Sequence, residues 1–264
     1  MRDFKFTVHD PKDTLHRRHF IGAQDTAIVL SRLPSDVLGR LKGVHFSDRA
    51  RGNRRLGYVN RGRREICICA LPPHLSLTQA LLGSQTPEIF GALRGCQWPF
   101  LAIRRFMLYD TLLHELGHLQ VVHENEREVR RKFAMEPLAQ EFADTWRESL
   151  WSRHFESPDL AHNPPSSSEL DATRAHWPQA HALYRLGQAQ FKKRNFDEDY
   201  KLLKESVDLY PYHSMALEKI GICYLYGTGP ELSIVRAKEY FAAALKLDPY
   251  IPMAYIYMSP RAGK

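Results

Sequence analysis

The sequence of 264 residues lacks long hydrophobic runs. No window approaches the roughly 18 to 20 uninterrupted apolar residues of a membrane-spanning helix. The first twenty residues are charged throughout and contain no apolar segment of the kind that a secretory signal needs. The apolar fraction of 44% and the charged fraction of 25% are typical of soluble globular proteins. These features predict a cytoplasmic protein with no membrane partner.

Cysteine is also scarce. The four cysteines, Cys67, Cys69, Cys96 and Cys223, show neither a disulfide framework nor zinc-finger spacing. Without an export signal, they are expected to be reduced thiols. Cys67 and Cys69 alternate in a β-rich run, so we expect both to share one face of a strand as small buried groups.

Acidic residues are nearly absent from residues 40–64, where nine basic residues accompany the single acid Asp48. Such a cluster is able to bind nucleic acid or acidic segments of a protein. No base-reading motif accompanies it, and a solvated loop and hairpin is the simpler interpretation. A nucleic-acid-associated role is therefore kept only as an alternative.

A stretch rich in proline and serine, residues 156–178, divides the chain and is predicted to be a linker. Residues 1–155 mix β-rich runs with helical patterns, whereas residues 179–264 have helical patterns alone. The predicted fold is an α+β domain with a small sheet, followed by an all-α domain.

The β-rich runs of the first part, residues 54–59 and 64–71, flank Asn60-Arg61-Gly62, whose Asn and Gly are typical of hairpin loops. A long apolar helix is predicted over residues 100–122. A further helix is predicted over residues 136–155, with Pro137 near its first turn.

The helical part is internally repetitive, because residues 182–211 align with residues 215–249. This pattern resembles the tetratricopeptide repeat, whose period is about 34 residues. The resemblance implies two helical hairpins, with the apolar tail 250–258 as a capping helix and a groove that docks a peptide or partner protein. A purely structural helical appendage is the alternative. The matching positions are Leu183, Leu186, Gly187, Leu203 and Pro211, and then Leu217, Ile220, Gly221, Tyr224, Ala237, Phe241, Ala244 and Pro249.

The long helix contains a possible metal-binding motif, His114-Glu115-Leu116-Gly117-His118, which fits the pattern H-E-x-x-H. Residues i and i+4 share one face of a helix, so both imidazoles are able to bind one ion. Glu115 is then able to reach a metal-bound water, whose pKa zinc lowers to about 7, and to remove its proton. We expect one zinc ion per chain, with His114 and His118 as ligands and Glu115 as the general base. The alternative is a pair of core histidines.

Catalytic zinc sites use three protein ligands, so a third ligand is expected. His123 lies five residues after His118, which turns it about 140° away from the ligand face of a continuous helix. The metzincin pattern fails because Val121 occupies its glycine position and the final histidine falls one residue short. The third ligand is therefore expected outside this helix.

Residues 140–144, Gln-Glu-Phe-Ala-Asp, supply better candidates. Together with H-E-x-x-H they resemble the gluzincins and the compact minigluzincin-like peptidases, over residues 25–155. In those proteins a glutamate on a following helix is the third ligand, and a nearby aspartate supports a ligand imidazole. The resemblance implies Glu141 as the third ligand. It implies Asp144 as the partner of a ligand imidazole, or as the fallback ligand. The spacing departs from the family, because the position four residues before Asp144 is Gln140.

Two further expectations concern the surroundings of the motif. Asp110, one turn before His114, is a second possible partner of a ligand imidazole, although the pattern favours an ordinary polar residue at the helix surface. The strand 64–71 precedes the helix as the substrate-binding edge strand does in zincins. This resemblance implies that a peptide would pair with that strand through backbone hydrogen bonds.

The motif and the repeats together predict a zinc-dependent endopeptidase that hydrolyses a protein or peptide substrate. The repeats would dock that substrate or a regulatory protein. Two alternatives remain: a non-catalytic zinc-containing scaffold or sensor that acts through the repeats, and a nucleic-acid-associated protease that uses residues 40–64.

Overall fold

The computed structural model describes residues 5–8, 18–47, 56–71, 86–120, 129–153, 155 and 157–258. Contacts divide the chain into two units, Met1–Leu75 with Ile103–Ser157, and Ser76–Ala102 with Pro158–Lys264. We call them unit 1 and unit 2 and describe each separately. Residues 76–102 therefore group with the helical part and not with the predicted first domain of residues 1–155. No helix in the described ranges is both long and apolar enough to cross a bilayer.

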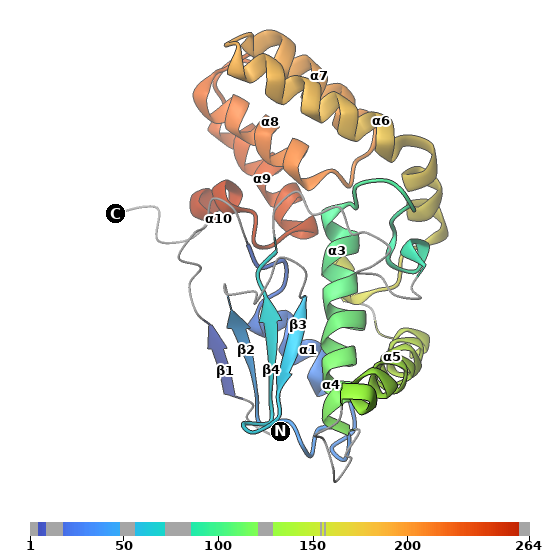
Figure 1. The fold of residues 1–264 in the computed structure, drawn as a ribbon. Coiled ribbons are helices and arrows are strands. Elements are labelled where there is room, and N and C mark those ends of the chain that lie inside the picture. Colours follow the sequence, from blue (N-terminus) through green and yellow to red (C-terminus); the bar gives the residue numbers. More distant parts are fainter. Residues whose placement is uncertain are drawn as a thin grey trace. The chain divides into compact units, whose positions relative to one another are not determined.

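Unit 1 contains a four-stranded sheet with the order β1-β2-β4-β3 (Figure 1). β1 pairs with β2 and β2 with β4 in parallel, whereas β3 runs antiparallel to β4. This small sheet agrees with the predicted α+β composition. The strands are β1 (Lys5–Val8), β2 (Gly43–Ser47), β3 (Gly57–Asn60) and β4 (Glu65–Cys69).

The β3–β4 hairpin confirms the hairpin that the sequence predicts. Its turn is stabilised by Asn60, whose side-chain oxygen accepts from the amide of Arg63 at 3.2 Å. The predicted edge strand is wrong, because β4 lies between β2 and β3. Residues 66–69 are all buried, as the two-sided contacts of a central strand require, and β3 is the strand at the end of the described sheet.

Helices cover this sheet (Figure 1). Residues 100–120 form the predicted long helix as α3 (Phe100–Phe106), one π-helical segment (Met107–Thr111) and α4 (Leu112–Gln120). α5 (Val129–Ser152) begins seven residues before the predicted start, so Pro137 lies inside this helix rather than in its first turn. α1 (Ala23–Ser31) completes the described helices of the unit.

Unit 2 is helical. α6 spans Ser167–Lys192, so the linker predicted over residues 156–178 is wrong for its second half. Ser166 caps this helix by accepting from the amide of Glu169 at 3.1 Å, which explains why a serine-rich stretch starts a helix. The remaining elements are η1 (Pro87–Phe90), η3 (Leu160–His162), α7 (Phe196–Leu209), α8 (Ser214–Tyr226), α9 (Ile234–Leu247) and α10 (Pro252–Met258).

The helices of unit 2 pack in pairs, α6 with α7 and α8 with α9. In the second pair, a Cβ on Gly221 would lie 2.6 Å from the ring of Phe241, so only glycine permits this approach. In the first pair, the buried Ser206 donates to the carbonyl of Ala180 at 2.8 Å. This hydrogen bond gives the buried hydroxyl a partner where α6 and α7 pack together.

His213 gives unit 2 a built-in sensitivity to acid. Its side chain is buried beside His181, and its Nδ1 accepts from the amide of Ala216 at the start of α8. Burial, together with the charge of His181, lowers the pKa of His213 from 6.5 to about 3. The unfolded chain binds a proton below pH 6.5 while the folded chain does not, so folding stability falls as the pH drops from 6.5 towards 3.

We therefore expect the His213→Asn variant, which keeps a capping acceptor but not the titration, to lose less stability in this pH window. The difference in slope should approach about 1.4 kcal/mol per pH unit. Hydrogen exchange of the α8 amides, measured by mass spectrometry in the full chain at each pH, reports the stability of this helix. Equal slopes for the parent and the variant would contradict the assignment.

Candidate metal centre

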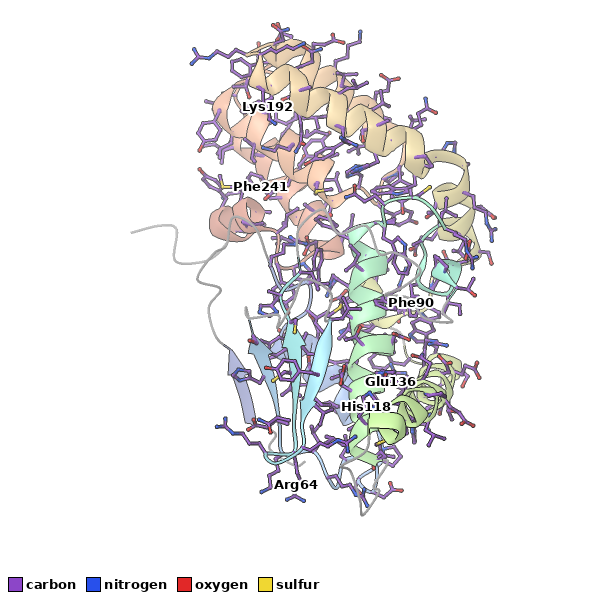
Figure 2. All side chains as sticks on the ribbon, in the orientation of Figure 1. Arg64, Phe90, His118, Glu136, Lys192 and Phe241 are labelled. Carbon is purple, nitrogen blue, oxygen red and sulfur yellow. The ribbon has the colours of Figure 1, made fainter. Side chains whose placement is uncertain are left out.

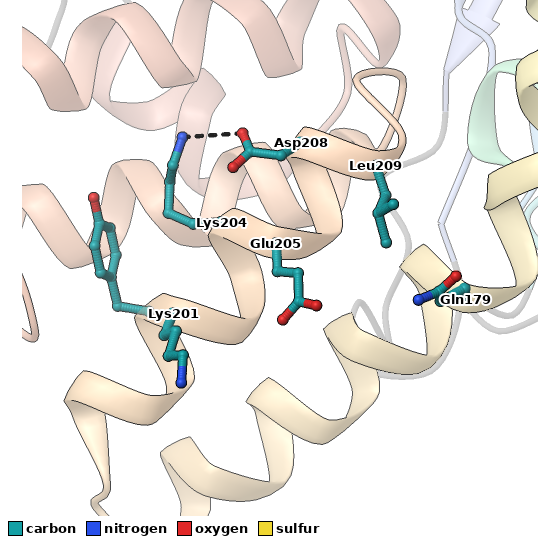
Figure 3. Close-up of a pocket in the computed structure, with 7 residues that line it drawn as sticks. Gln179, Lys201, Lys204, Glu205, Asp208 and Leu209 are labelled. Atoms are coloured by element: carbon teal, nitrogen blue, oxygen red, sulfur yellow. Dashed lines mark hydrogen bonds and ion pairs between the residues drawn. The ribbon is translucent and has the colours of Figure 1, made fainter.

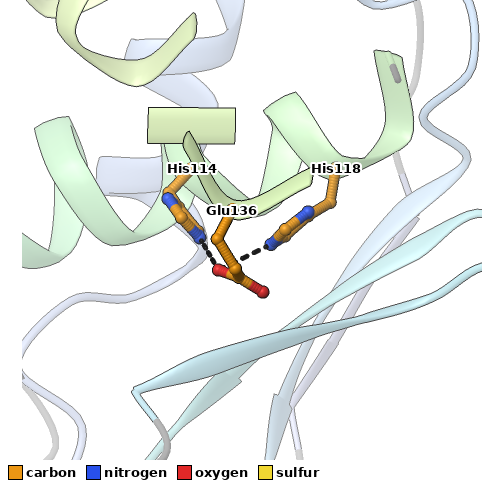
Figure 4. A group of neighbouring side chains, drawn as sticks. All are labelled: His114, His118 and Glu136. Atoms are coloured by element: carbon orange, nitrogen blue, oxygen red, sulfur yellow. Dashed lines mark hydrogen bonds and ion pairs between the residues drawn. The ribbon is translucent and has the colours of Figure 1, made fainter. Parts of the chain in front are cut away.

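α4 presents His114 and His118 on one face, as the i,i+4 spacing requires (Figure 4). Their ring centroids lie 4.7 Å apart, and the ring planes are nearly perpendicular. Both imidazoles are mostly buried, with side-chain exposures of 19% and 13%. The structure thus brings together the two histidines that the motif predicts.

The carboxylate of Glu136, on α5, lies between the two rings (Figure 4). Its Oε2 is 3.1 Å from Nε2 of His114 and 3.5 Å from Nε2 of His118. Around a tetrahedral zinc ion with ligand distances of about 2.0–2.1 Å, two ligand atoms lie about 3.3 Å apart. Two imidazoles and one carboxylate with this spacing fit a catalytic zinc centre.

The expected third ligand, Glu141, is not part of this group. Among the described residues, the cluster that could hold a metal here consists of His114, His118 and Glu136, while Glu141 is exposed on α5. Five residues separate Glu136 from Glu141, which places them about 140° apart around the helix. Figure 2 shows His118 and Glu136 where α4 and α5 meet. His123, the other alternative, lies outside the described residues.

The close approach of α4 and α5 depends on Gly117. A Cβ at this position would lie 2.9 Å from the carbonyl oxygen and 3.0 Å from the Cα of Ala139, distances at which something must move. Ala139 and Ala143 are fully buried and present small side chains on α5. This small-residue contact brings Glu136 within reach of the histidines.

Gly117→Ala should therefore push α5 away and separate Glu136 from both imidazoles. We expect a loss of stability of about 1–3 kcal/mol, as for other overpacked cores. Zinc affinity, measured by competition with a chromophoric chelator, should fall about tenfold or more. Gly62→Ala is the control, because its Cβ would meet nothing closer than 3.8 Å. Unchanged zinc affinity in the Gly117 variant would show that the helix contact does not position Glu136.

A second layer of polar residues supports His114. Nδ1 of His114 lies 3.1 Å from Oε1 of Gln140, whose amide nitrogen donates to Asp110 at 2.9 Å and to Asp144 at 3.1 Å. Arg147 pairs with Asp144 at 2.8 Å and lies 3.8 Å from Asp110. Asp144 thus supports the site through Gln140 and not by direct contact with a ligand ring.

The surface position predicted for Asp110 is wrong, because this residue is buried. It lies in the π-helical segment, a feature often found near functional sites. Burial raises the pKa of Asp110 to about 6, although the hydrogen bond from Gln140 and the charges of His114 and Arg147 oppose the shift. Asp110 therefore belongs to the buried support of the site.

The electrostatics of the cluster favour the ionised form of Glu136 and the protonated form of His114. Hydrogen bonds from His114 and His118 hold the pKa of Glu136 well below its usual range. Burial disfavours the charged form of His114, but the hydrogen bond to Glu136 and the charges of Glu115, Glu136 and Asp110 outweigh it and raise its pKa. The group is therefore built around an ionised carboxylate, which is the form that binds a cation.

Glu115 lies against the edge strand β3. It is buried, and a Cβ on Gly57 would lie 3.0 Å from its Cγ and 3.2 Å from its Oε1. Glycine at position 57 therefore leaves the space that the Glu115 side chain occupies. The motif places this carboxylate on the same helical turn as the two histidines, with β3 beside it.

Part of the basic segment supports the site helix. Arg40 donates to the carbonyls of Leu119 and Gln120 at 3.3 and 3.0 Å, at the C-terminal end of α4, where a cation is favourable. Arg63 and Arg64 are exposed in the β3–β4 turn. The nucleic-acid alternative stays a prediction, with at least one of its arginines engaged in the fold.

A hollow of about 590 Å³ lies between α6 and α7 (Figure 3). Its lining includes Lys204 and Asp208, which pair with each other at 3.4 Å. Its described lining contains no histidine or cysteine. The lining residues are Gln179, Tyr200, Lys201, Lys204, Glu205, Asp208 and Leu209.

No protein-family model, no curated protein and no solved structure matches this chain. The functional argument therefore depends on the geometry of the candidate centre. The sequence pointed to the two histidines and Glu115 but not to Glu136, which the structure places beside both imidazoles. The spacing of Glu136, Gln140 and Asp144 at four-residue intervals, one stripe of a single helix, was the pattern that could have revealed it.

Proposed function

We propose that this protein is a zinc-dependent endopeptidase in which His114, His118 and Glu136 hold the metal ion. One observation carries the proposal: Glu136 lies 3.1 and 3.5 Å from the outer nitrogens of an H-E-x-x-H pair. A buried histidine pair in a structural role would have no need of a carboxylate next to it in sequence. Glu115 supplies one.

The residues divide the chemistry between them. His114, His118 and Glu136 would hold a zinc ion, which would supply Lewis acidity and make water a better nucleophile at neutral pH. Glu115 accepts the proton of the attacking water and then delivers it to the leaving amine nitrogen as the peptide bond breaks. Gly57 keeps space for Glu115, and the half-exposed Glu136 leaves one side of the cluster open to substrate.

The edge strand β3 is the proposed binding site for substrate. It stands at the end of the described sheet and contacts α4. An extended peptide that paired with β3 would bring its backbone past Gly57 and so past the carboxylate of Glu115. The sequence predicts that a substrate peptide pairs with residues 64–71; we now propose that it pairs with β3 instead.

We also propose that tetratricopeptide-like repeats in unit 2 dock a substrate or regulatory protein. The paired helices of this unit support the proposal. Leu186 and Phe191 on α6 are 55% and 41% exposed. Large apolar side chains that only pack within a fold are buried, so this exposure favours a binding surface. Lys219 lies 5.3 Å above the ring of Phe191. Apolar side chains next to the positive charge of Lys219 would suit a peptide that has both apolar side chains and an acidic one.

The test is cleavage of a peptide library by the full chain loaded with one zinc ion. Cleavage in the parent and its loss in Glu115→Gln are expected. A chain that binds zinc in a one-to-one ratio but cleaves nothing in the library would reject the peptidase and favour the zinc-containing scaffold. A chain that binds no zinc would reject both.

A further inference from the structure

Gln140 stands at the centre of the polar residues behind His114. Its side-chain nitrogen faces one oxygen of Asp110 and one of Asp144, at 2.9 and 3.1 Å. Ionised carboxylates only accept hydrogen bonds, so the atom facing them must be the NH₂ group. The carbonyl oxygen of Gln140 is therefore the atom that faces His114.

This orientation requires a proton on Nδ1 of His114. The carbonyl oxygen of Gln140 only accepts, so Nδ1 of His114, at 3.1 Å, must donate. Nε2 is then the atom left for the metal, and it is the atom that faces Glu136. Reversing the amide would place its oxygen against the carboxylates of Asp110 and Asp144. Arg147 lies within ion-pair distance of both carboxylates.

We propose that Gln140 is a positioning residue that fixes the Nδ1 proton of His114, with Asp110, Asp144 and Arg147 fixing the orientation of its amide. The inference rests on the proposed metal centre and deepens it. His118 provides a contrast, because its Nδ1 is buried and has no hydrogen-bond partner in the described part of the chain. The two ligand histidines are thus held differently.

The first experiment follows the ring N–H protons by nitrogen-15 NMR of the zinc-free full chain with labelled histidine. Gln140→Met keeps the length of the side chain and removes both of its hydrogen-bonding groups. We expect the Nδ1 proton of His114 to be protected from exchange in the parent and to exchange faster in this variant. The corresponding signal of His118 should not change.

The second experiment measures zinc affinity by competition with a chromophoric chelator. Gln140→Met should weaken binding about 10- to 100-fold, the usual effect of removing the partner of a ligand histidine. The triple variant Gln140→Glu/Asp110→Asn/Asp144→Asn turns both neighbouring carboxylates into amides, so residue 140 still accepts from His114 and also accepts from residues 110 and 144. It should recover affinity to within several-fold of the parent.

Two results would overturn the proposal. In the first, the Nδ1 proton of His114 stays equally protected in Gln140→Met. In the second, the methionine variant loses zinc but the triple variant does not recover it, which would mean that Gln140 acts through packing alone. The NMR measurement needs neither zinc nor proteolysis, so its failure is separate from a failure of the peptidase proposal.

Discussion

Glu136→Ala should abolish stoichiometric zinc binding at micromolar metal concentrations. The carboxylate lies within 3.5 Å of both outer imidazole nitrogens, so its removal leaves two ligands where a catalytic zinc needs three. Removing a supporting partner already costs about 10- to 100-fold in affinity, and removing a ligand should cost more than that. Zinc content by elemental analysis after dialysis, together with the dissociation constant, measures the effect.

Glu141→Ala is the matched control, because it removes the same functional group from the same helix. Glu141 is exposed and lies outside the cluster of His114, His118 and Glu136. We expect its zinc affinity to stay within about twofold of the parent. The opposite pattern, with zinc lost in Glu141→Ala and kept in Glu136→Ala, would reject Glu136 as the ligand and support the one that the gluzincin resemblance implies.

The sequence predicts well those features that depend on local spacing. His114 and His118 meet because they lie four residues apart on one helix, and no tertiary contact is needed for that. The hairpin follows from its Asn and Gly, and the long helix follows from its apolar run. The predicted burial of Cys67 and Cys69 is confirmed, and both lie in the continuously buried run of β4.

The position of Glu136, the proposed third ligand, depends on information that spacing alone does not contain. Pro137 suggests a helix start, since proline is favoured in the first turn, and Glu136 is then the first residue of the predicted helix. In the structure the helix begins at Val129, so Glu136 lies well inside it. Which face of α5 meets α4 is decided by Gly117 and Ala139, a close contact between residues distant in sequence.

The position of β4 illustrates the same limit. The sequence places this strand immediately before the motif helix in chain order, whereas the order of strands in the sheet is set by pairing. β4 pairs on both sides, with β2 and with β3, and its continuous burial is typical of a central strand. A run such as Ile66–Cys69, without alternation of apolar and polar residues, already favours a central strand over an edge strand.

Glu115→Gln should lower peptide hydrolysis by about 10²–10⁴-fold, the usual contribution of a general base, while zinc binding is kept. The amide has the size of the carboxylate and so fits the space beside Gly57, but it accepts no proton from the attacking water. The rate constant kcat should fall with little change in KM, because the lost interaction belongs to the transition state. Steady-state kinetics on a substrate identified from the library, with zinc content measured on the same samples, separates the two effects.

Glu148→Gln makes the same chemical change at an exposed position of α5 and should leave both hydrolysis and zinc content unchanged. It controls for the loss of one negative charge from the chain. If Glu115→Gln cleaves the substrate as fast as the parent does, the general-base role is wrong, whatever the metal content. If it loses zinc together with activity, Glu115 contributes to binding the metal, and a proton-transfer role no longer explains the loss.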